Sequence, residues 1–311
     1  MNKKILRIGT RESQLAVWQA TRVQQLLAEH QIESELVFMK SEGDIDLVTP
    51  LYALGVQGVF TRTLDAALLS NRIDIAVHSM KDVPTQLAIG ITQAAVLERA
   101  SYRDLMVVNP NRKEAIDINL FDTAVTIATS SIRRKAQWLN RYPNHDIDNL
   151  RGNVNTRLRK VGESNWYGAI FAAAGLERIA LRPEDAYELD WMLPAPAQGA
   201  IMIVCREEDA EAKAMCSQLN HAATATCTKI ERDFLKTLMG GCSTPISALA
   251  EIKEEQLSFK GNIYTLDGKD KKEIAIQVST KESIENIGIN AAEQLLNQGA
   301  DKIVESIRNA G

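Results

Sequence analysis

The chain of 311 residues carries a formal net charge of −4 and combines 45% hydrophobic with 24% charged residues. This composition is typical of a globular protein and excludes a disordered or fibrous chain, and the negative charge argues against a protein that coats nucleic acid. The length is sufficient for two or three domains. No secretory segment is visible, and the longest uncharged apolar stretch, residues 169–176, is far shorter than the roughly 20 residues of a membrane helix. We therefore expect a soluble, cytoplasmic protein without a membrane partner.

The first hundred residues alternate between strand and helix patterns. Short apolar runs predict strands, and apolar residues at helical spacing predict helices. The strands are expected at residues 4–10, 35–40 and 73–80, and the helices at residues 14–30 and 60–71. This alternation is typical of a parallel α/β unit.

A second run with the same alternation begins near Asp104. Strands are expected at residues 104–109, 124–130, 146–152 and 167–175, and helices at residues 131–142 and 155–162. We interpret this run as a second α/β domain.

The rest of the chain predicts a return to the first unit and then a smaller domain. Residues 192–207 combine two prolines with a strong strand pattern, which indicates a crossover followed by a strand that joins an earlier sheet. Two helices are expected next, at residues 208–220 and 224–238, and then antiparallel strands and a long C-terminal helix. We expect an α/β domain 1 of residues 1–98 plus 199–220, an α/β domain 2 of residues 99–198, and a C-terminal α+β domain of residues 221–311.

Ser79, Lys81 and Asp82 lie at the C-terminal end of a predicted buried strand, at the edge where α/β sheets usually bind ligands. The carboxylate of Asp82 could act as an acid or a base, or stabilise a developing cation. The alternative is a solvated ion pair in a turn. His78 in the same strand is expected to be a core histidine, because no other metal ligand lies at a useful spacing. We expect no metal site.

Two strand-to-helix junctions in the second unit are rich in arginine. Residues 128–162 contain eight Lys or Arg and two acidic residues, including Arg133 and Arg134 in the first turn of a predicted helix. Positive charges at that end oppose the helix dipole, so a negative ligand nearby would explain them. A solvated basic face capped by hydroxyl groups is the alternative. The pattern indicates a site for a polyanion, and no phosphate-binding loop motif accompanies it.

The four cysteines are Cys205, Cys216, Cys227 and Cys242, and they form no CxxC pair. Cys242 lies in the sequence GGCSTP directly after a predicted helix end. A lone cysteine of this kind is usually a small buried hydrophobe, and the negative end of a helix should raise the pKa of its thiol. By itself Cys242 would need a very reactive electrophile.

Seven motifs in the same order resemble the porphobilinogen deaminase (hydroxymethylbilane synthase) family: RIGTRESQLA, VHSMKDVP, ATSSIRR, LRGNVNTRL, AAAGLER, LPAPAQGA and GGCSTPI. The resemblance implies two periplasmic-binding-protein-like (type II) α/β lobes with a central cleft, plus the smaller C-terminal domain. It also implies an enzyme of tetrapyrrole and heme biosynthesis. Such an enzyme joins four porphobilinogen units head to tail, releases ammonia each time, and then releases linear hydroxymethylbilane by hydrolysis.

The resemblance assigns roles to individual residues. Cys242 would carry a dipyrromethane cofactor through a thioether, since loss of ammonia from the substrate leaves an azafulvene that an ordinary thiol can attack. Asp82 would be the catalytic carboxylate. Contacts to the cofactor and the growing polypyrrole chain, whose pyrroles each carry an acetate and a propionate, would come from Arg11, Ser13, Phe60, Ser79, Lys81, Thr129, Ser130, Arg133, Arg134, Arg151, Gly152, Asn153, Arg157, Arg178 and Gln198.

The chain departs from the family pattern at several positions. Residues 41–58 match a mobile loop over the cleft, and there Gln57 and Ala53 replace lysines that are common in the family. The strand-end arginines are then expected to bind more of the carboxylates. Ala197 and Asn155, which replace glycines, are expected to be tolerated.

Two other functions remain open on the sequence alone. A non-catalytic two-lobed protein that binds an anion would explain the arginines but would leave Cys242 without a role. An RNA-binding protein could use the basic residues 131–160, but that stretch lacks interleaved aromatic residues for base stacking. We expect an enzyme that acts on porphobilinogen, works as a monomer and has no nucleic-acid partner.

Overall fold

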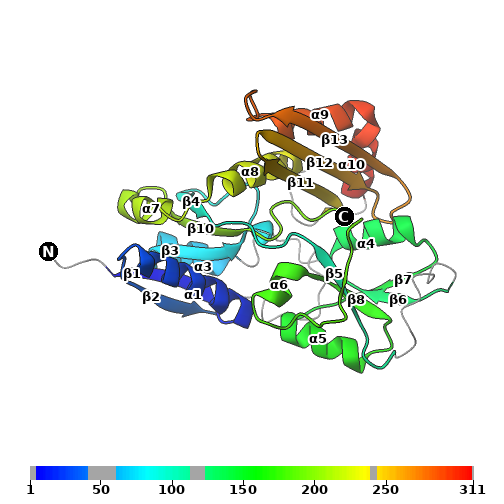
Figure 1. Cartoon of the computed structure of the whole chain (residues 1–311), viewed down its shortest axis with the longest axis horizontal. Coiled ribbons are helices and arrows are strands. Elements are labelled where there is room, and N and C mark those ends of the chain that lie inside the picture. The colour runs from blue at the N-terminus through cyan, green and yellow to red at the C-terminus, as the bar shows by residue number, and fades with distance from the viewer. Residues whose placement is uncertain (1–4, 41–60, 113–122, 239–243, 310–311) are drawn as a thin grey trace.

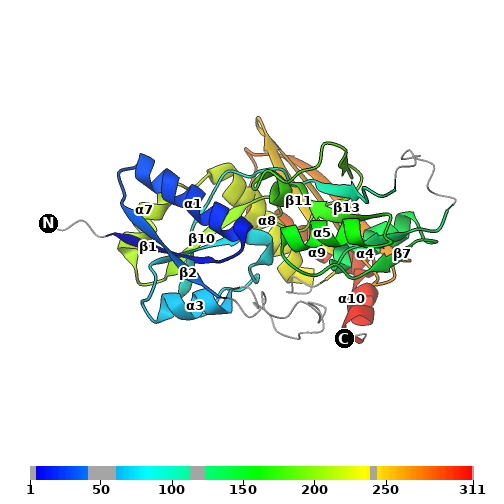
Figure 2. The same ribbon diagram turned by 90° about the horizontal axis from the view of Figure 1, so that it is seen from below.

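The computed structural model describes residues 5–40, 61–112, 123–238 and 244–309, and three units are distinct in Figure 1. Two of them are α/β lobes, each built on a five-stranded sheet, and the third is built on a three-stranded sheet. Figure 2 shows the two lobes side by side along the long axis of the molecule. No helix among the described residues is long and apolar enough to cross a membrane.

The sheet of the first lobe has the order β2-β1-β3-β10-β4. Strands β1 (Leu6–Arg11), β2 (Ser34–Met39) and β3 (Ile75–Ser79) are parallel, and β10 (Ile201–Arg206) runs antiparallel to β3 and to β4 (Ile91–Val96). Helices α1 (Gln14–Glu29) and α7 (Ala210–Ser217) cover one face of this sheet, and α3 (Arg62–Leu69) covers the other. The sheet is therefore mixed, because the returning strand enters it in the opposite direction.

The sheet of the second lobe repeats this arrangement in the order β7-β6-β8-β5-β9. Strands β6 (Thr126–Ala128), β7 (Asp146–Asp148) and β8 (Gly168–Ala172) are parallel, whereas β5 (Asp104–Val108) is antiparallel to β8 and to β9 (Tyr187–Glu188). Helices α5 (Val154–Glu163) and α6 (Ala173–Glu177) contribute to one core cluster, and α4 (Ile132–Arg141) contributes to another. One expectation was wrong here: residues 173–175 begin α6 and do not continue the strand.

Two crossover segments join the lobes, and they are hydrogen-bonded to each other. The first runs from β4 to β5 and the second leads into β10. The amide of Ala100 donates to the carbonyl of Gly199 at 3.1 Å, and Arg99 Nε donates to the carbonyl of Gln198 at 2.8 Å. Gly199 has a φ of 88°, and a β-carbon there would lie 2.6 Å from the carbonyl oxygen of Ala100. The close approach of the two segments therefore requires glycine at this position.

The third unit packs three helices against an antiparallel sheet. It comprises α8 (Ala222–Leu238), the strands β11 (Ile246–Lys253), β12 (Gln256–Tyr264) and β13 (Lys271–Ser279), and the helices α9 (Ile287–Leu295) and α10 (Asp301–Asn309). Its core includes the edge-to-face pair Phe234 and Phe259, with ring centroids 5.2 Å apart. The expected long C-terminal helix is interrupted by the segment Leu296–Ala300, where Gly299 has a φ of 95°.

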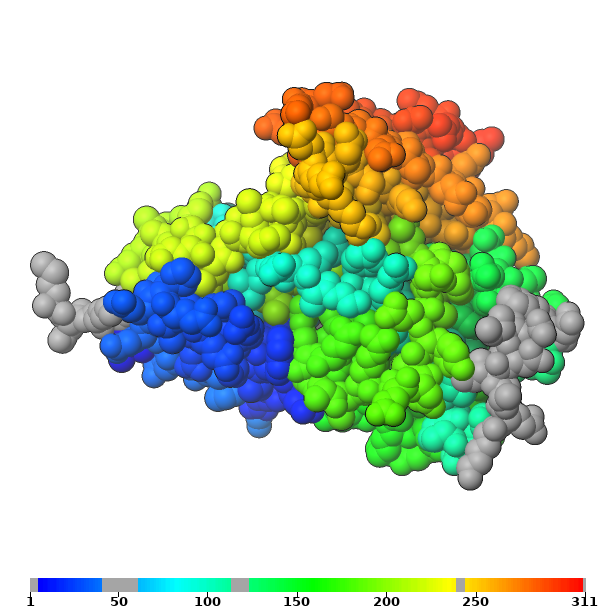
Figure 3. Space-filling model, viewed as in Figure 1, coloured from blue at the N-terminus to red at the C-terminus, as the bar shows by residue number. Residues whose placement is uncertain are grey.

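The third unit contacts both lobes, and Figure 3 shows it lying across them. Arg232 of α8 donates to the carbonyl of Val83 in the first lobe at 2.9 Å, and Gln137 of the second lobe donates to Ser247 Oγ at 2.9 Å. The junction is centred on Glu231 of α8, which is fully buried. Its carboxylate accepts hydrogen bonds from the Arg99 guanidinium (2.6 and 3.1 Å) and the Ala197 amide (2.6 Å), which belong to the two crossovers. It also accepts one from the amide of Ala250 in β11, at 2.8 Å.

Candidate active site

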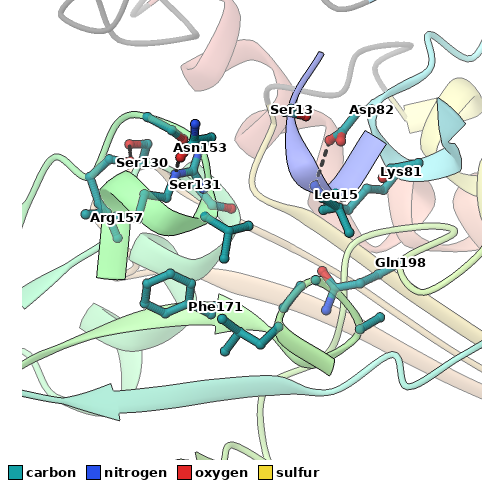
Figure 4. A pocket seen from close by; sticks show the side chains of 18 of the residues that line it. Ser13, Leu15, Lys81, Asp82, Ser130, Ser131, Asn153, Arg157, Phe171 and Gln198 are labelled. Atoms are coloured by element: carbon teal, nitrogen blue, oxygen red, sulfur yellow. Dashed lines mark hydrogen bonds and ion pairs between the residues drawn. The ribbon is translucent and has the colours of Figure 1, made fainter. Parts of the chain in front are cut away.

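A cavity of about 600 Å³ lies where the two α/β sheets face each other. Its walls are formed by residues that follow the carboxyl ends of the parallel strands β1, β3, β6 and β8, and by the turn between β7 and α5. Parallel strands place their carboxyl ends at one edge of a sheet, so each lobe presents one such edge to the cavity. Figure 4 shows residues of the first lobe, including Asp82, facing Ser130, Asn153 and Arg157 of the second.

The first lobe contributes the turn that carries Asp82. Ser79 ends β3, and Met80–Asp82 forms a short 3₁₀ turn beyond it. Lys81 Nζ lies 2.7 Å from Asp82 Oδ1, and both side chains are about one-third exposed, at 33% and 37%. Ser79 Oγ accepts a hydrogen bond from Gln19 of α1 at 2.8 Å. The ion pair that the sequence left as an alternative is therefore present, and it lies in the wall of the cavity.

The second lobe contributes two capped helix N-termini. Ser131 precedes α4 and its side chain accepts from the amide of Arg134, while Asn153 precedes α5 and accepts from the amide of Thr156 at 2.9 Å. The first turns of α1, α4, α5 and α6, which all begin at the cavity, contain no acidic residue. Helix N-termini carry partial positive charge, so these helix ends from both lobes favour a negatively charged ligand.

Arg157 and Arg178 are cations held in partly buried positions. Burial lowers the pKa of Arg157 to about 10; the nearby charges of Arg134 and Arg151 also lower it, whereas Asp82 raises it. Its Nε donates to the carbonyl of Gly152 at 2.7 Å. Burial likewise lowers the pKa of Arg178 to about 10. Because burial disfavours an unpaired charge, both side chains would gain from a carboxylate ligand.

Arg133 and Arg134 are buried rather than solvated, with 4% and 7% of their surface exposed. Their negative partner is Asp104, at the start of β5, which is fully buried. The Asp104 carboxylate lies 2.8 Å from Arg133 Nη2 and 2.7 Å from Arg134 Nη2. A protein carboxylate is thus one negative partner of the two arginines in this first helical turn. The alternative was correct in its hydroxyl cap, because Ser131 caps α4, but wrong in its solvated face, because Arg133 and Arg134 are buried.

Gln198 belongs to the same cluster. Its Nε2 donates to Asp104 Oδ1 at 2.9 Å and to the carbonyl of Tyr102 at 2.7 Å, so its amide links the second crossover to the first. The side chain is 1% exposed although the residue lines the cavity.

The cavity is strongly basic within an acidic protein. Among the described lining residues, eight are basic (Arg11, Lys40, Lys81, Arg133, Arg134, Arg151, Arg157 and Arg178) and two are acidic (Glu12 and Asp82). Such an excess is suited to a ligand that carries several carboxylates.

Every described residue that the sequence proposed for the site lines this cavity: Arg11, Ser13, Ser79, Lys81, Asp82, Thr129, Ser130, Arg133, Arg134, Arg151, Gly152, Asn153, Arg157, Arg178 and Gln198. Phe60 and Cys242 lie outside the described residues, as do Ala53 and Gln57. Thr244, two positions after Cys242, is described and lines the cavity.

Sequence reasoning missed several lining residues, notably Lys40, Asn155 and Phe171. Lys40 directly follows β2, so its place at a strand end was a signal that could have found it. Asn155 donates to Gln14 Oε1 of the first lobe at 2.9 Å, a contact between lobes that no local pattern predicts.

His78 is a core residue, as expected. It is 6% exposed, and burial lowers the pKa of its imidazole to about 4. No group of three or more potential metal ligands occurs among the described residues.

Solved structures with a similar arrangement are distant in sequence. A periplasmic substrate-binding protein of an ABC transporter from Coxiella burnetii matches with a TM-score of 0.45 and 13% identity, over 71% of this chain and 94% of the other. The methionine-binding protein MetQ matches with a TM-score of 0.43 and 14% identity, over 69% of this chain and 89% of the other.

Two family models cover most of the sequence. The model described as porphobilinogen deaminase, dipyromethane cofactor binding domain, matches residues 6–214, and the model of the porphobilinogen deaminase C-terminal domain matches residues 225–297. Curated proteins named porphobilinogen deaminase match nearly end to end. The protein from Chlorobium phaeobacteroides is 39% identical over 99% of both chains, and that from Syntrophotalea carbinolica is 40% identical over 99% of this chain and 97% of its own. This chain belongs to the porphobilinogen deaminase family.

Proposed function

We propose that this chain is a hydroxymethylbilane synthase, a transferase of tetrapyrrole and heme biosynthesis. It condenses four porphobilinogen units head to tail with release of ammonia, and then releases linear hydroxymethylbilane by hydrolysis. The observation that carries this proposal is the cavity in which Asp82 of one lobe faces the arginine-rich wall of the other. Relatives named porphobilinogen deaminase, matched over nearly the whole chain, support the same activity.

The lining fits the family's dipyrromethane cofactor, whose two pyrroles each carry an acetate and a propionate. Eight cations and two carboxylates among the described lining residues supply the charge, and Arg133 Nε is buried without a hydrogen-bond partner. Thr244 lines the cavity, and its position two residues after Cys242 in the sequence supports cofactor attachment at Cys242. When bound, the dipyrromethane supplies a nucleophilic pyrrole carbon.

Asp82 is the residue that we propose for catalysis. Its carboxylate is adjacent to Lys81 and partly exposed in the cavity wall, where it can accept a hydrogen bond from a pyrrole nitrogen. Positive charge develops on the substrate as ammonia leaves, and a fixed carboxylate in a partly desolvated cavity stabilises that charge.

The remaining residues of the site are proposed to bind and orient carboxylates. The arginines and Lys81 would pair with acetate and propionate groups, and Ser13, Thr129, Ser130, Gly152 and Asn153 would present hydroxyls and amides at helix N-termini. Phe60 is proposed to contact the growing chain. We further propose that the enzyme is a cytoplasmic monomer, with domain boundaries at residues 1–98 plus 199–220, 99–198 and 221–311; the return of β10 to the first sheet supports this division.

The intact mass of the purified protein tests the proposal. Wild-type protein should exceed the mass of the polypeptide by one dipyrromethane, and Cys242→Ala should have the mass of the bare chain and consume no porphobilinogen. A wild-type protein that turns over porphobilinogen but has the mass of the bare chain would contradict the proposal of a covalent cofactor. A protein with neither the added mass nor turnover would be a binding protein of the same architecture.

A further inference from the structure

The buried cluster behind the second-lobe wall contains a carboxylate to which the reaction assigns no role. Asp104 is fully buried, and its two oxygens contact both arginines that follow Ser131. Burial by itself would raise the pKa of Asp104, but the positive charges of Arg133 and Arg134 outweigh it and lower that pKa. Asp104 is therefore an anion beside two cations, and the cluster has a net charge of about +1 where it faces the cavity.

Asp104 also occupies donors that a ligand would otherwise use. Arg134 donates hydrogen bonds to Asp104 Oδ1 through Nε at 3.1 Å and through Nη2 at 2.7 Å. Its Nη1 donates to the carbonyl of Ile170 at 2.9 Å. Arg133 donates through Nη1 to the carbonyl of Leu193 at 2.8 Å. Its Nη2 pairs with Asp104 and also donates to Gln198 Oε1 at 3.4 Å, whereas its Nε is buried without a partner. A guanidinium has five N–H donors, so each of these two arginines, which both line the cavity, keeps donors that Asp104 does not occupy.

The carboxylate is tied to the connection between the lobes. Asp104 lies at the end of the first crossover, and Gln198 of the second crossover donates to its Oδ1 at 2.9 Å. A ligand that draws Arg133 or Arg134 toward the cavity must therefore compete with a carboxylate fixed in this connection.

We propose that Asp104 is a positioning residue that competes with substrate carboxylates for Arg133 and Arg134, so that these arginines bind the growing chain weakly enough to release it at each addition. This inference rests on the proposed function. A chain that lengthens in steps must pass its carboxylates from one cation to another, and a fully available pair of buried arginines would retain them.

The variant Asp104→Asn separates this role from a merely structural one. If Asp104 competes with the ligand, its neutralisation should tighten carboxylate binding. The KM for porphobilinogen should fall about five- to tenfold, and so should the dissociation constant of succinate, a simple dicarboxylate probe whose binding is measured directly by titration calorimetry. The kcat should fall as well, because release is slowed. Damage to the wall would raise both constants. The matched control is Asp146→Asn, an exposed carboxylate on β7 outside the cavity, which should change neither constant.

A double variant addresses the risk that Asp104→Asn folds poorly. Asp104→Asn with Arg133→Gln removes one charge of each sign, so the cluster keeps its net charge of about +1. Its dissociation constant for succinate should return toward the wild-type value. Unchanged or weaker succinate binding in folded Asp104→Asn, or equal tightening in both variants, would overturn the proposal. Wild-type turnover of porphobilinogen reports separately on the proposed function, because the succinate measurements require no turnover.

Discussion

At the scale of single residues, Asp82 should affect turnover more than binding. Its carboxylate is proposed to stabilise charge that exists only as ammonia leaves, so Asp82→Asn should lower kcat about 100- to 1000-fold and change KM by no more than about threefold. Steady-state kinetics with porphobilinogen measure both constants. Asp185→Asn, a change to an exposed carboxylate away from the cavity, is the control. A variant with raised KM and unchanged kcat would place Asp82 among the binding residues instead.

His78 should make the fold sensitive to acid. Its imidazole is 6% exposed, with a pKa lowered by burial to about 4 from the ordinary 6.5, so the unfolded chain binds a proton more readily than the folded protein. The resulting stability is complete above about pH 6.5 and is lost as the pH falls toward 4. Between pH 7 and pH 5 this amounts to about 2 kcal/mol.

Urea unfolding at these two pH values tests the His78 prediction. The free energy of unfolding of His78→Gln should fall about 2 kcal/mol less than that of the wild type between pH 7 and pH 5, since glutamine does not titrate. Parallel losses in the two proteins would show that other groups control the acid response. Each protein is compared with itself across pH, so a constant cost of the substitution does not affect the result.

At the scale of elements, α8 holds the third unit to both crossovers through Glu231. Glu231→Gln removes the charge opposite Arg99 and replaces one acceptor oxygen with a donor, while the side chain remains fully buried. Removing one partner of a buried ion pair leaves the other charge uncompensated. The free energy of unfolding should therefore fall by about 3–5 kcal/mol. Urea or thermal denaturation measures this change.

The same helix provides the control for Glu231. Asp233 pairs with Lys229 at 2.6 Å, but the lysine side chain is 63% exposed. A solvated pair one turn apart contributes about 0.3–0.5 kcal/mol, so Asp233→Asn should be nearly neutral. Similar losses in the two variants would mean that the position of Glu231 between the crossovers adds nothing to its effect.

At the scale of the whole molecule, the sequence predicted the lobes and the site because both depend on local patterns. Alternating strands and helices place Ser79 at the end of one strand and Thr129 and Asn153 after the ends of two others, and parallel strands bring such ends to one edge. The prolines after Met192 indicated the returning strand, and β10 does join the first sheet. Its antiparallel direction depends on the second crossover, which no local pattern describes.

Contacts between distant segments could not be predicted from the sequence. The sequence pattern predicts Asp104 only as the first residue of an apolar strand. Its pairing with Arg133 and Arg134 was not predicted, because these residues lie about thirty positions further along the chain. In the sequence, Glu231 is likewise only one charged residue of an amphipathic helix. Its contacts with the two crossovers appear only in the folded protein. Buried charges of this kind follow from tertiary packing, because only the folded protein removes both partners from water.

The contrast between an acidic molecule and a basic cavity predicts how the enzyme responds to salt. The chain has a net charge of −4, whereas the described cavity lining holds eight cations and two carboxylates, so attraction of a carboxylate-rich substrate must act at short range. The Debye length falls from about 10 Å at 0.1 M salt to about 3 Å at 1 M. Across that range KM for porphobilinogen should rise about three- to tenfold, with kcat changing less than about twofold, since screening weakens approach and binding more than chemistry inside the cavity. Arg157→Gln should show a shallower rise, because one of the screened charges is absent. A KM independent of salt in both proteins would mean that the cations act only after the substrate is desolvated, and that the field of the cavity does not reach the solvent.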